Sequence, residues 1–273
     1  MENNERLYDA KDHLVAQNVH QMTCDIITQA YHKGNKRSSS RALLAFVCRN
    51  AGSWESLRTL LSSCGDTERM KAIALDCGAI LRCMYDAYLQ ALFVWEDPNS
   101  RDDRGSLYLD YAHVERHKLS QDALRQDDSL SRYLAASPLR TESEDKVRQN
   151  YEQVKDRYLN SKRKGVRDHW YPHDNLRTLA RCVGKESEYV WLVKMMNGSV
   201  HTGPFAMFNG PPLPGSGTLY IANKILSNTI GFLVDNECIV LDSGVRELLN
   251  ACRGPLVGHA VPLNRRSDGH ANH

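Results

Sequence analysis

The sequence predicts an all-α protein, a multi-helix bundle arranged around one long apolar helix. The stretch 67–95, TERMKAIALDCGAILRCMYDAYLQALFVW, is longer and more apolar than any other segment of the chain. Elsewhere apolar residues recur at three- and four-residue spacing, and no segment shows the strict alternation that is typical of a half-buried strand. With 273 residues, of which 41% are hydrophobic, the chain is long enough to bury a sizeable core.

The segments before the central helix carry helix starts and stops of their own. A first helix is expected over 4–32, ended by Lys33-Gly34. A second is expected over 41–50, capped by one of the serines at 38–40 and broken at Gly52-Ser53, with a separate short helix over 54–61. Asp66 and Thr67 offer caps for the central helix, and Asp97-Pro98 ends it.

Beyond Pro98 the pattern predicts further helices, separated by polar or Gly/Pro-rich loops. One helix starts near Asp102 and runs through Val114, and a loop with some short helix follows over 120–141. Helices are then expected over 142–159, from Asp174 or Asn175 to about 184, and from Ser187 to about 198. A loop over 203–217 precedes two last helices, over 220–234 and 244–251. We therefore expect one helical domain over 1–255 and a disordered tail over 256–273.

Composition and motifs exclude several classes of function. A net charge of +2 is too small for a bulk nucleic-acid binder, although it permits a small RNA site. The polar start MENNERLYDA lacks a secretory signal, and the apolar runs are shorter than the roughly 20 residues that span a bilayer. We expect a cytoplasmic protein without a membrane partner. No Walker loop, dinucleotide fingerprint, nucleophile elbow or Cys-x-x-Cys pair occurs, so no cofactor or zinc ion is expected, and the sequence leaves the oligomeric state open.

Arg82 and Asp86 stand on the apolar seam of the central helix, where Leu89 and Phe93 continue the same face. They are four residues apart and can pair, but arginine before aspartate is the weaker order for a helical ion pair. Burying both groups is costly unless further hydrogen bonds compensate. Three interpretations follow: an internal ion pair that braces two helices, a ligand or catalytic site, or an exposed pair.

Histidines supply the other candidate groups. His201 follows a predicted helix end and precedes Gly203-Pro204, where the helix dipole favours its imidazolium form. This position suits a general acid or a phosphate contact, and it equally suits a plain helix cap. His113 and His117 lie four apart, with Asp110 three residues earlier, which is weak metal-ligand spacing. The pattern His-Glu-x-x-His is absent, so exposed surface histidines are the favoured interpretation.

A loose alternative involves Arg167, Asp168 and His173, which fit the Arg-polar-x-His spacing of HEPN ribonucleases. In such a metal-independent site the arginine would bind phosphate and the histidine would move a proton at the 2′-hydroxyl or the leaving oxygen. Pro172 lies inside the motif and disfavours the helix that HEPN proteins use there.

The central helix with Arg82 and its acidic partner resembles a prokaryotic all-helical family of unknown function over about residues 70–250. That family has an Arg-x-x-x-acid helix, a Trp followed by a short helix with an Arg, a Tyr-bearing helix and a final Ser/Asn-rich His. The matching positions here are Arg82, Asp86, Trp170, Arg177, Tyr189 and His201. The family more often carries Glu at the position of Asp86. The run before the histidine, which contains Ser in the family, is Asn197-Gly198-Ser199.

The resemblance implies a helical bundle in which the Arg–acid pair and the histidine face one pocket. It implies no established reaction, although similar helical domains occur in bacterial defence and toxin contexts. Two hypotheses follow. The first is a site for an anion, with RNA phosphate favoured, in which His201 is the acid or base, Arg82 or Arg177 holds phosphate and Asp86 orients a partner, with Trp170, Tyr189 and Asn197 beside them. The second is a non-catalytic interaction or sensor module whose Arg–Asp pair is only structural.

Overall fold

Helices make up nearly all of the regular structure in the residues that the computed structural model describes: 10–32, 36–63, 67–125, 143–160, 165–200, 215–236, 239, 241 and 243–256. Within these ranges there are nine α-helices, one 3-10 helix (η1) and no strand beyond an isolated antiparallel bridge between Leu159 and Val166. The predicted all-α fold is therefore confirmed. None of the described helices is long and apolar enough to cross a membrane.

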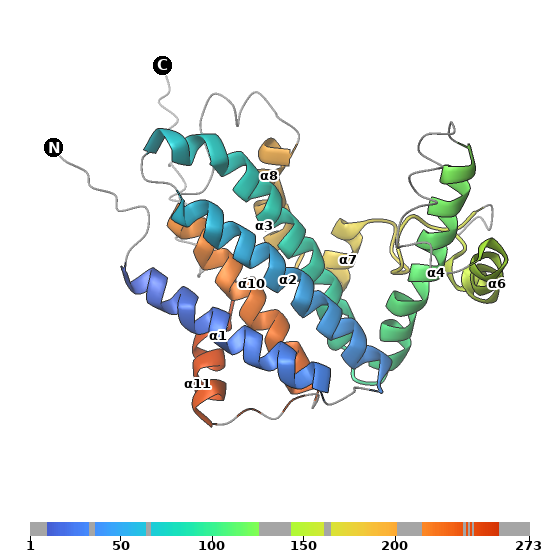
Figure 1. The fold of residues 1–273 in the computed structure, drawn as a ribbon, viewed down its shortest axis with the longest axis horizontal. Coiled ribbons are helices and arrows are strands. Elements are labelled where there is room, and N and C mark those ends of the chain that lie inside the picture. The colour runs from blue at the N-terminus through green and yellow to red at the C-terminus, as the bar shows by residue number, and fades with distance from the viewer. Residues whose placement is uncertain are drawn as a thin grey trace, which may run out of the picture.

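The helices follow one another along the chain as Figure 1 labels them. Their bounds are α1 (Ala10–His32), α2 (Ser38–Ser62), α3 (Thr67–Trp95), α4 (Arg101–Arg125), α6 (Glu144–Val154), η1 (Lys155–Tyr158), α7 (Leu176–Cys182), α8 (Glu186–Val200), α10 (Gly215–Asp235) and α11 (Ser243–Cys252).

The α3 helix is the centre of the bundle, as the sequence predicts. It packs against α2, α10, α8, α7 and α4. Its buried side chains include Leu81, Met84, Tyr85 and Leu89, all fully shielded from solvent. Because its neighbours come from both ends of the chain, the core joins residues far apart in the sequence.

The N-terminal end of α4 lies against this bundle, and the rest of α4 extends away from the bundle with α6 alongside (Figure 1). Two phenols tie the following segments to α4. Tyr158 in η1 donates a hydrogen bond to the carbonyl of Leu107 at 2.7 Å, and Tyr111 donates to the carbonyl of Arg167 at 2.8 Å. These bonds position the loop 165–175, which carries Trp170 and His173 back toward the end of α3.

Two arginines at the start of α4 complete the end of α3. Arg101 Nε donates to the carbonyl of Trp95 at 2.6 Å, and Arg104 Nη1 donates to the carbonyl of Phe93 at 2.5 Å. The last carbonyls of a helix have no partner within the helix and carry its negative partial charge. The guanidinium groups therefore donate hydrogen bonds to these carbonyls and offset their negative partial charge.

The N-terminus of α2 differs from the prediction of a serine cap. The helix begins at Ser38, and its N-cap residue is Arg37, whose side chain makes no capping bond. The acceptor comes from α4 instead: Asp102 accepts from the backbone N–H of Ser39 at 3.1 Å and from its hydroxyl at 2.6 Å. Gly105 allows this approach, because a Cβ there would lie 2.4 Å from the backbone nitrogen of Ser39.

Several predicted helix ends were wrong. α2 continues through Gly52-Ser53 as one helix, because a helical glycine costs only about 1 kcal/mol relative to alanine and the packing of Trp54 and Leu57 exceeds that cost. α4 extends into the segment predicted as a loop, to Arg125, and α10 begins at Gly215 inside the loop predicted for 203–217. α8 begins before its predicted cap at Ser187. Residues 126–142 and 257–273, including most of the predicted tail, lie outside the described ranges.

Buried polar side chains join α2 to α10. Asn50 donates to the hydroxyl of Thr229 at 3.1 Å, and Trp54 Nε1 donates to Asn223 at 2.6 Å. Such bonds inside an apolar interface fix which residues face each other, because any shift would leave buried polar groups without partners. Thus α10, which comes late in the sequence, is held in one register against α2.

Candidate functional site

The two charged residues on the central helix form an ion pair. Arg82 Nε lies 2.8 Å from Asp86 Oδ1, as the four-residue spacing on one helix face allows. The side chains are 16% and 26% exposed, respectively. The pair is therefore neither sealed beneath apolar side chains nor fully hydrated, and solvent can still reach both charged groups.

A tyrosine from α8 completes this cluster. Arg82 Nη2 donates to the phenol oxygen of Tyr189 at 3.4 Å, and the guanidinium carbon lies 5.4 Å from the centre of the same ring. A cation near an aromatic face is attracted to it. Arg82, Asp86 and Tyr189, which we call the arginine cluster, thus come together although Tyr189 lies more than 100 residues after the other two in the sequence.

A second polar contact involves the residue just before Tyr189 in α8. Tyr85 donates to Glu188 at 3.3 Å, and Glu188 also pairs with Lys185 at 3.3 Å. Burial raises the pKa of Tyr85 far above its usual value, and the charge of Glu188 adds to this effect. Tyr85 therefore stays protonated and serves as a hydrogen-bond donor.

Trp170 reaches the same helix through an amide. Its Nε1 donates to Gln90 Oε1 at 2.5 Å, and Gln90 in turn donates to the backbone carbonyl of Asp86 at 3.2 Å. The indole is 4% exposed and packs against Phe46, Phe93 and Tyr108. Trp170 thus braces the helix segment that carries Asp86, and its ring faces other aromatic side chains.

The electrostatics of the pair follow from its partial burial. Burial raises the pKa of Asp86, and the attraction of Arg82 and of Arg49 in α2 only partly offsets this. Burial acts in the opposite sense on Arg82, but the charge and hydrogen bond of Asp86 outweigh it and raise the pKa of Arg82. The guanidinium is thereby held firmly charged, next to a carboxylate that accepts a proton more readily than usual.

Arg177, predicted as a phosphate contact, pairs with a glutamate of the next helix. It lies exposed in α7, where its Nε bonds to Glu186 at 3.1 Å, and Arg181 pairs with the same carboxylate at 2.7 Å. The hydrogen bond from Arg181 is the main cause that lowers the pKa of Glu186 to about 2, and Arg177 adds to it. No hydrogen bond within the described residues joins Arg177 to the arginine cluster.

Arg167 and His173 occupy the loop between η1 and α7. Both terminal nitrogens of Arg167 donate to backbone carbonyls, those of Tyr171 at 2.9 Å and Arg157 at 3.0 Å. His173 packs edge-on against Phe93, with ring centres 5.5 Å apart, and burial lowers its pKa. The segment 165–175 is not helical, which agrees with the expectation drawn from Pro172. Arg167 holds this loop together through its bonds to backbone carbonyls.

The two histidines of α4 are both partly buried. His117 stacks on Tyr151 of α6 with ring centres 3.9 Å apart, and burial lowers its pKa. His113 lies half-buried one turn before it. Among the described residues, no group of three or more His, Cys, Asp or Glu side chains is placed to hold a metal ion.

Two predicted site residues cannot be placed in this cluster. Asn197 belongs to α8, two turns beyond Tyr189, but its side chain lies outside what the structure describes. His201 follows directly after α8 and also lies outside the described ranges. Its convergence with Arg82 and Asp86 stays a prediction.

The sequence analysis missed four participants in or beside the cluster: Arg49, Tyr85, Gln90 and Glu188. The hydrogen bonds of Tyr85 to Glu188 and of Gln90 to Trp170 join residues far apart in the sequence, and no local pattern indicates them. Of the four, Gln90 was the easiest to infer from the sequence, because it lies four residues after Asp86 on the same helix.

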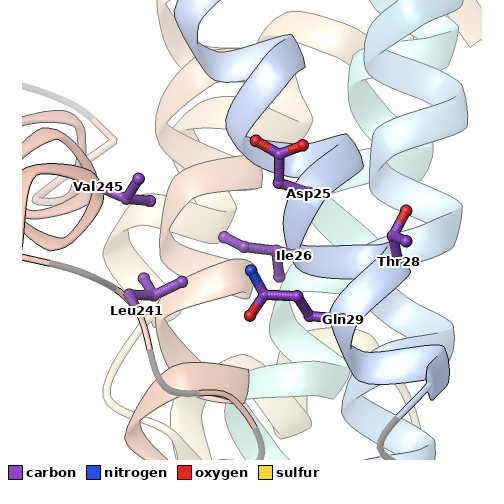
Figure 2. A pocket seen from close by; sticks show the side chains of 6 residues that line it. All are labelled: Asp25, Ile26, Thr28, Gln29, Leu241 and Val245. Atoms are coloured by element: carbon purple, nitrogen blue, oxygen red, sulfur yellow. The ribbon is translucent and has the colours of Figure 1, made fainter.

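A recess of about 250 Å³ lies elsewhere in the molecule, between α1 on one side and Leu241 and the start of α11 on the other (Figure 2). The side chains of Ile26 and Gln29 face Leu241 and Val245 across it, and Asp25 and Thr28 lie at its margin. None of these residues belongs to the arginine cluster.

The fold and this site define an all-helical protein whose central helix carries a half-buried Arg–Asp pair, with a tyrosine from a later helix completing the cluster. The chain belongs to a family of unknown function, DUF5677, whose model matches residues 43–210. Arg49, Arg82, Asp86, Trp170, Tyr189 and His201 all lie inside the matched stretch. Comparisons with curated proteins and with solved structures give no match.

Proposed function

We propose that the arginine cluster binds an anion, and that this anion is a phosphate group of RNA. The observation that carries the proposal is the state of Arg82, which is held in place by Asp86 at 2.8 Å and by Tyr189 and yet remains partly exposed. A guanidinium with a fixed orientation loses little conformational freedom when it binds a phosphate, and its planar set of donors matches phosphate oxygens.

Burial strengthens this role. An exposed arginine in water gains little from one more anion, because solvent screens the interaction. Arg82 lies where water is partly excluded, so a bound phosphate would interact with it more strongly. Asp86 fixes the guanidinium from one side, which agrees with the expectation that it orients a partner.

The enzymatic form of the proposal adds metal-independent cleavage, in a defence or toxin role, with His201 as acid or base. In that reaction the 2′-oxygen forms a bond to phosphorus, and the bond from phosphorus to the 5′-oxygen breaks. A base takes the 2′-hydroxyl proton, and an acid gives a proton to the leaving 5′-oxygen. Arg82 would hold the phosphate during this exchange.

Binding and cleavage can be tested separately. Binding is measured by fluorescence polarisation with a labelled 2′-O-methyl RNA of about 20 nucleotides, which lacks the attacking hydroxyl. Arg82→Ala should weaken binding at least about tenfold, the scale of one charge-assisted contact. The matched control is Arg148→Gln, which removes an exposed arginine that pairs with Asp145 in α6. If Arg82→Ala and Arg148→Gln behave alike, the proposal is wrong.

Cleavage is measured with the same sequence as unmodified RNA, and growth arrest on expression provides a cellular readout. His201→Ala should keep binding and lose about 10²- to 10⁴-fold in cleavage rate, the usual contribution of one acid or base. Cleavage at the wild-type rate in a folded His201→Ala protein would remove the catalytic role of His201 and leave the binding proposal intact.

A non-catalytic interaction or sensor module is the second candidate, and one observation favours it. Asp86 and Tyr189 already accept hydrogen bonds from Arg82, as in a purely structural pair. In that case Arg82→Met combined with Asp86→Leu should preserve the fold and every measurable activity, because apolar replacement of a whole pair is often neutral. Loss of RNA binding in this folded double variant would favour the first proposal.

A further inference from the structure

The loop 165–175 leads from η1, beside α4, back to α7 (Figure 1). Both of its ends are fixed by hydrogen bonds that involve no histidine. At its start, the hydroxyl of Tyr111 in α4 donates to the carbonyl of Arg167 at 2.8 Å. At its end, the side chain of Asn175 caps the N-terminus of α7. The middle of the loop, residues 169–174, which we call the strap, can therefore lift while both ends stay in place.

The strap packs on the end of the central helix through one aromatic ring, that of Phe93. The ring centre of Trp170 lies 5.8 Å from it, and the ring of His173 meets it edge-on at 5.5 Å. The indole of Trp170 also donates to Gln90, which in turn donates to the carbonyl of Asp86. The position of the strap is thus linked to the helix segment that carries the carboxylate of the arginine cluster.

His173 sits in a position that suits only a neutral imidazole. Its Nε2 is buried and has no hydrogen-bond partner among the described residues. In the neutral ring this isolation costs comparatively little, because the ring carries no charge. Protonation makes both ring nitrogens donors, and it would leave a charged N–H at Nε2 without an acceptor, which costs far more. Burial accordingly lowers the pKa of His173.

The cations that surround His173 also oppose a proton. Arg104 of α4 lies against the same ring of Phe93, with its guanidinium carbon 4.1 Å from the ring centre. Within the loop, Arg167 donates to a strap carbonyl at 2.9 Å, and a ring nitrogen of His169 contacts the carbonyl of His173. These three groups add to the effect of burial on the pKa of His173.

The carboxylates of the neighbouring elements do not compensate for these cations. Asp174, the next residue of the strap, favours the charged imidazole but is outweighed. At the end of α3, Glu96 and Asp97 lie 3.7 Å and 3.6 Å from Arg104, so they offset part of its charge. In α7, both arginines share Glu186. None of these carboxylates provides an acceptor for Nε2 of the imidazole.

We propose that the strap is a pH-sensitive brace of the central helix, closed when His173 is neutral and opened when His173 takes up a proton. Opening brings the imidazolium into water and breaks the bond from Trp170 to Gln90, so the segment of α3 around Asp86 loses its support. The closed strap is fully stable above the ordinary histidine pKa of 6.5 and loses stability as pH falls below it, because the closed state lowers that pKa. The strap would open in this way whether or not the arginine cluster binds RNA.

The first experiment measures hydrogen exchange of the backbone amides of the strap in the intact protein, at about pH 7.5 and about pH 5.5. Each rate is compared with that of the unfolded chain at the same pH, which gives a protection factor. In the wild type this factor should fall about threefold to tenfold, and tenfold is the limit for a histidine that is protonated only in the open strap. His173→Phe keeps an aromatic ring against Phe93 and cannot take up a proton, so its protection factor should not depend on pH.

Two further variants complete this experiment. His173→Gln is also uncharged, so its protection factor should be independent of pH even where the strap is held less firmly. His32→Gln removes an exposed histidine at the end of α1 and, as the matched control, should behave like the wild type. A fall in His173→Phe and His173→Gln as steep as in the wild type would overturn the proposal. A wild-type change smaller than about twofold would overturn it as well.

The second experiment follows the consequence for the arginine cluster, and this arm alone rests on the proposed function. Binding of the 2′-O-methyl RNA is measured at the same two pH values. Wild type and His173→Phe should bind equally at the higher pH, and the variant should bind at least about twofold more tightly at the lower pH. Equal affinities at both pH values would overturn the link between the strap and Asp86. A wild-type protein that binds no RNA would overturn the proposed function, and the exchange measurement would still decide whether the strap opens.

Discussion

Two arginine–carboxylate groups in this protein contain the same chemistry in different surroundings. Arg82 and Asp86 lie on the central helix with side chains 16% and 26% exposed. Arg177 and Arg181, 59% and 60% exposed, share Glu186 where α7 meets α8. The pKa of Asp86 is raised because burial outweighs its cations, whereas the pKa of Glu186 falls to about 2 because its arginines act without much burial.

The difference shows what partial burial does to an ion pair. At the α7–α8 junction the charges keep most of their hydration and are screened by water, so their pairing contributes little to the free energy of unfolding. On α3 the charges have lost hydration, so each depends on the other and is also more responsive to a new ligand. The first of these groups is therefore suited to the surface, and the second to a binding site.

The largest predicted effect comes from breaking the α3 pair on one side. Asp86→Ala leaves the guanidinium of Arg82 partly dehydrated without its carboxylate, and should lower the free energy of unfolding by about 2 kcal/mol. Urea denaturation followed by circular dichroism measures this. The double variant Arg82→Met/Asp86→Leu should recover most of the loss. A double variant no more stable than Asp86→Ala would show that the lost pair, and not the stranded charge, accounts for the cost.

The next effect tests how far the buried region extends beyond the pair. Trp170→Phe removes the hydrogen bond from the indole to Gln90. It should lower the free energy of unfolding by about 1–2 kcal/mol, because the amide oxygen of the half-buried Gln90 loses its donor. Trp191→Phe, at an exposed tryptophan of α8, is the control and should stay within about 0.5 kcal/mol. If Trp170→Phe and Trp191→Phe lowered the free energy of unfolding equally, the hydrogen bond from Trp170 to Gln90 would not stabilise α3.

The third prediction concerns the sign of the pH dependence, which should be opposite for the two carboxylates. Glu186 has a lowered folded-state pKa, so its contribution is present above the unfolded value of 4.5 and is lost as pH falls toward about 2. Asp86 has a raised folded-state pKa, so protonation stabilises the folded state. Its contribution is fully present below the unfolded value of 3.8 and is lost as pH rises through the folded value.

Thermal unfolding from pH 7 to pH 3 measures this for wild type, Asp86→Asn and Glu186→Gln. As pH falls, the wild type should gain stability relative to Asp86→Asn and lose it relative to Glu186→Gln. If the wild type lost stability relative to both variants as pH falls, burial would not be the dominant influence on the pKa of Asp86.

The smallest effect is expected at the surface group. Arg177→Gln leaves Glu186 paired with Arg181, so the midpoint of urea unfolding should not move beyond the repeat error. Binding of RNA should also be unchanged, because no described hydrogen bond joins Arg177 to the arginine cluster. Loss of RNA binding on this substitution would extend the site to α7 and weaken the contrast between the two groups.

Local pattern predicted the central helix and the shared face of Arg82 and Asp86, because helix periodicity alone fixes both. Tyr189 and Trp170 entered through the family resemblance, and the structure brings both to side chains of α3, Arg82 and Gln90. Arg49 could not be found in this way, since its relation to Asp86 arises only when α2 packs on α3.

The errors in helix ends have a related cause. A Gly-Ser pair signals a break when it is considered alone, but α2 continues through it as one helix that packs on α3 and α10. The cap of the same helix comes from Asp102, which is 63 residues away from Ser39 in sequence. Tertiary contacts decided both features, and a local pattern does not contain them.

The α2–α10 contacts also have a practical consequence for anyone preparing a shortened protein. A fragment cut to the matched residues 43–210 would start inside α2 and would omit α10 entirely. The removed helix contributes Ile225, Leu226, Ile230 and Leu233, which are fully shielded in the intact chain, and its loss would remove the acceptors of the hydrogen bonds from Asn50 and from the Trp54 indole. Family boundaries are thus poor cloning boundaries here: such a fragment should aggregate on expression, and the minimal workable gene should retain the codons for α10.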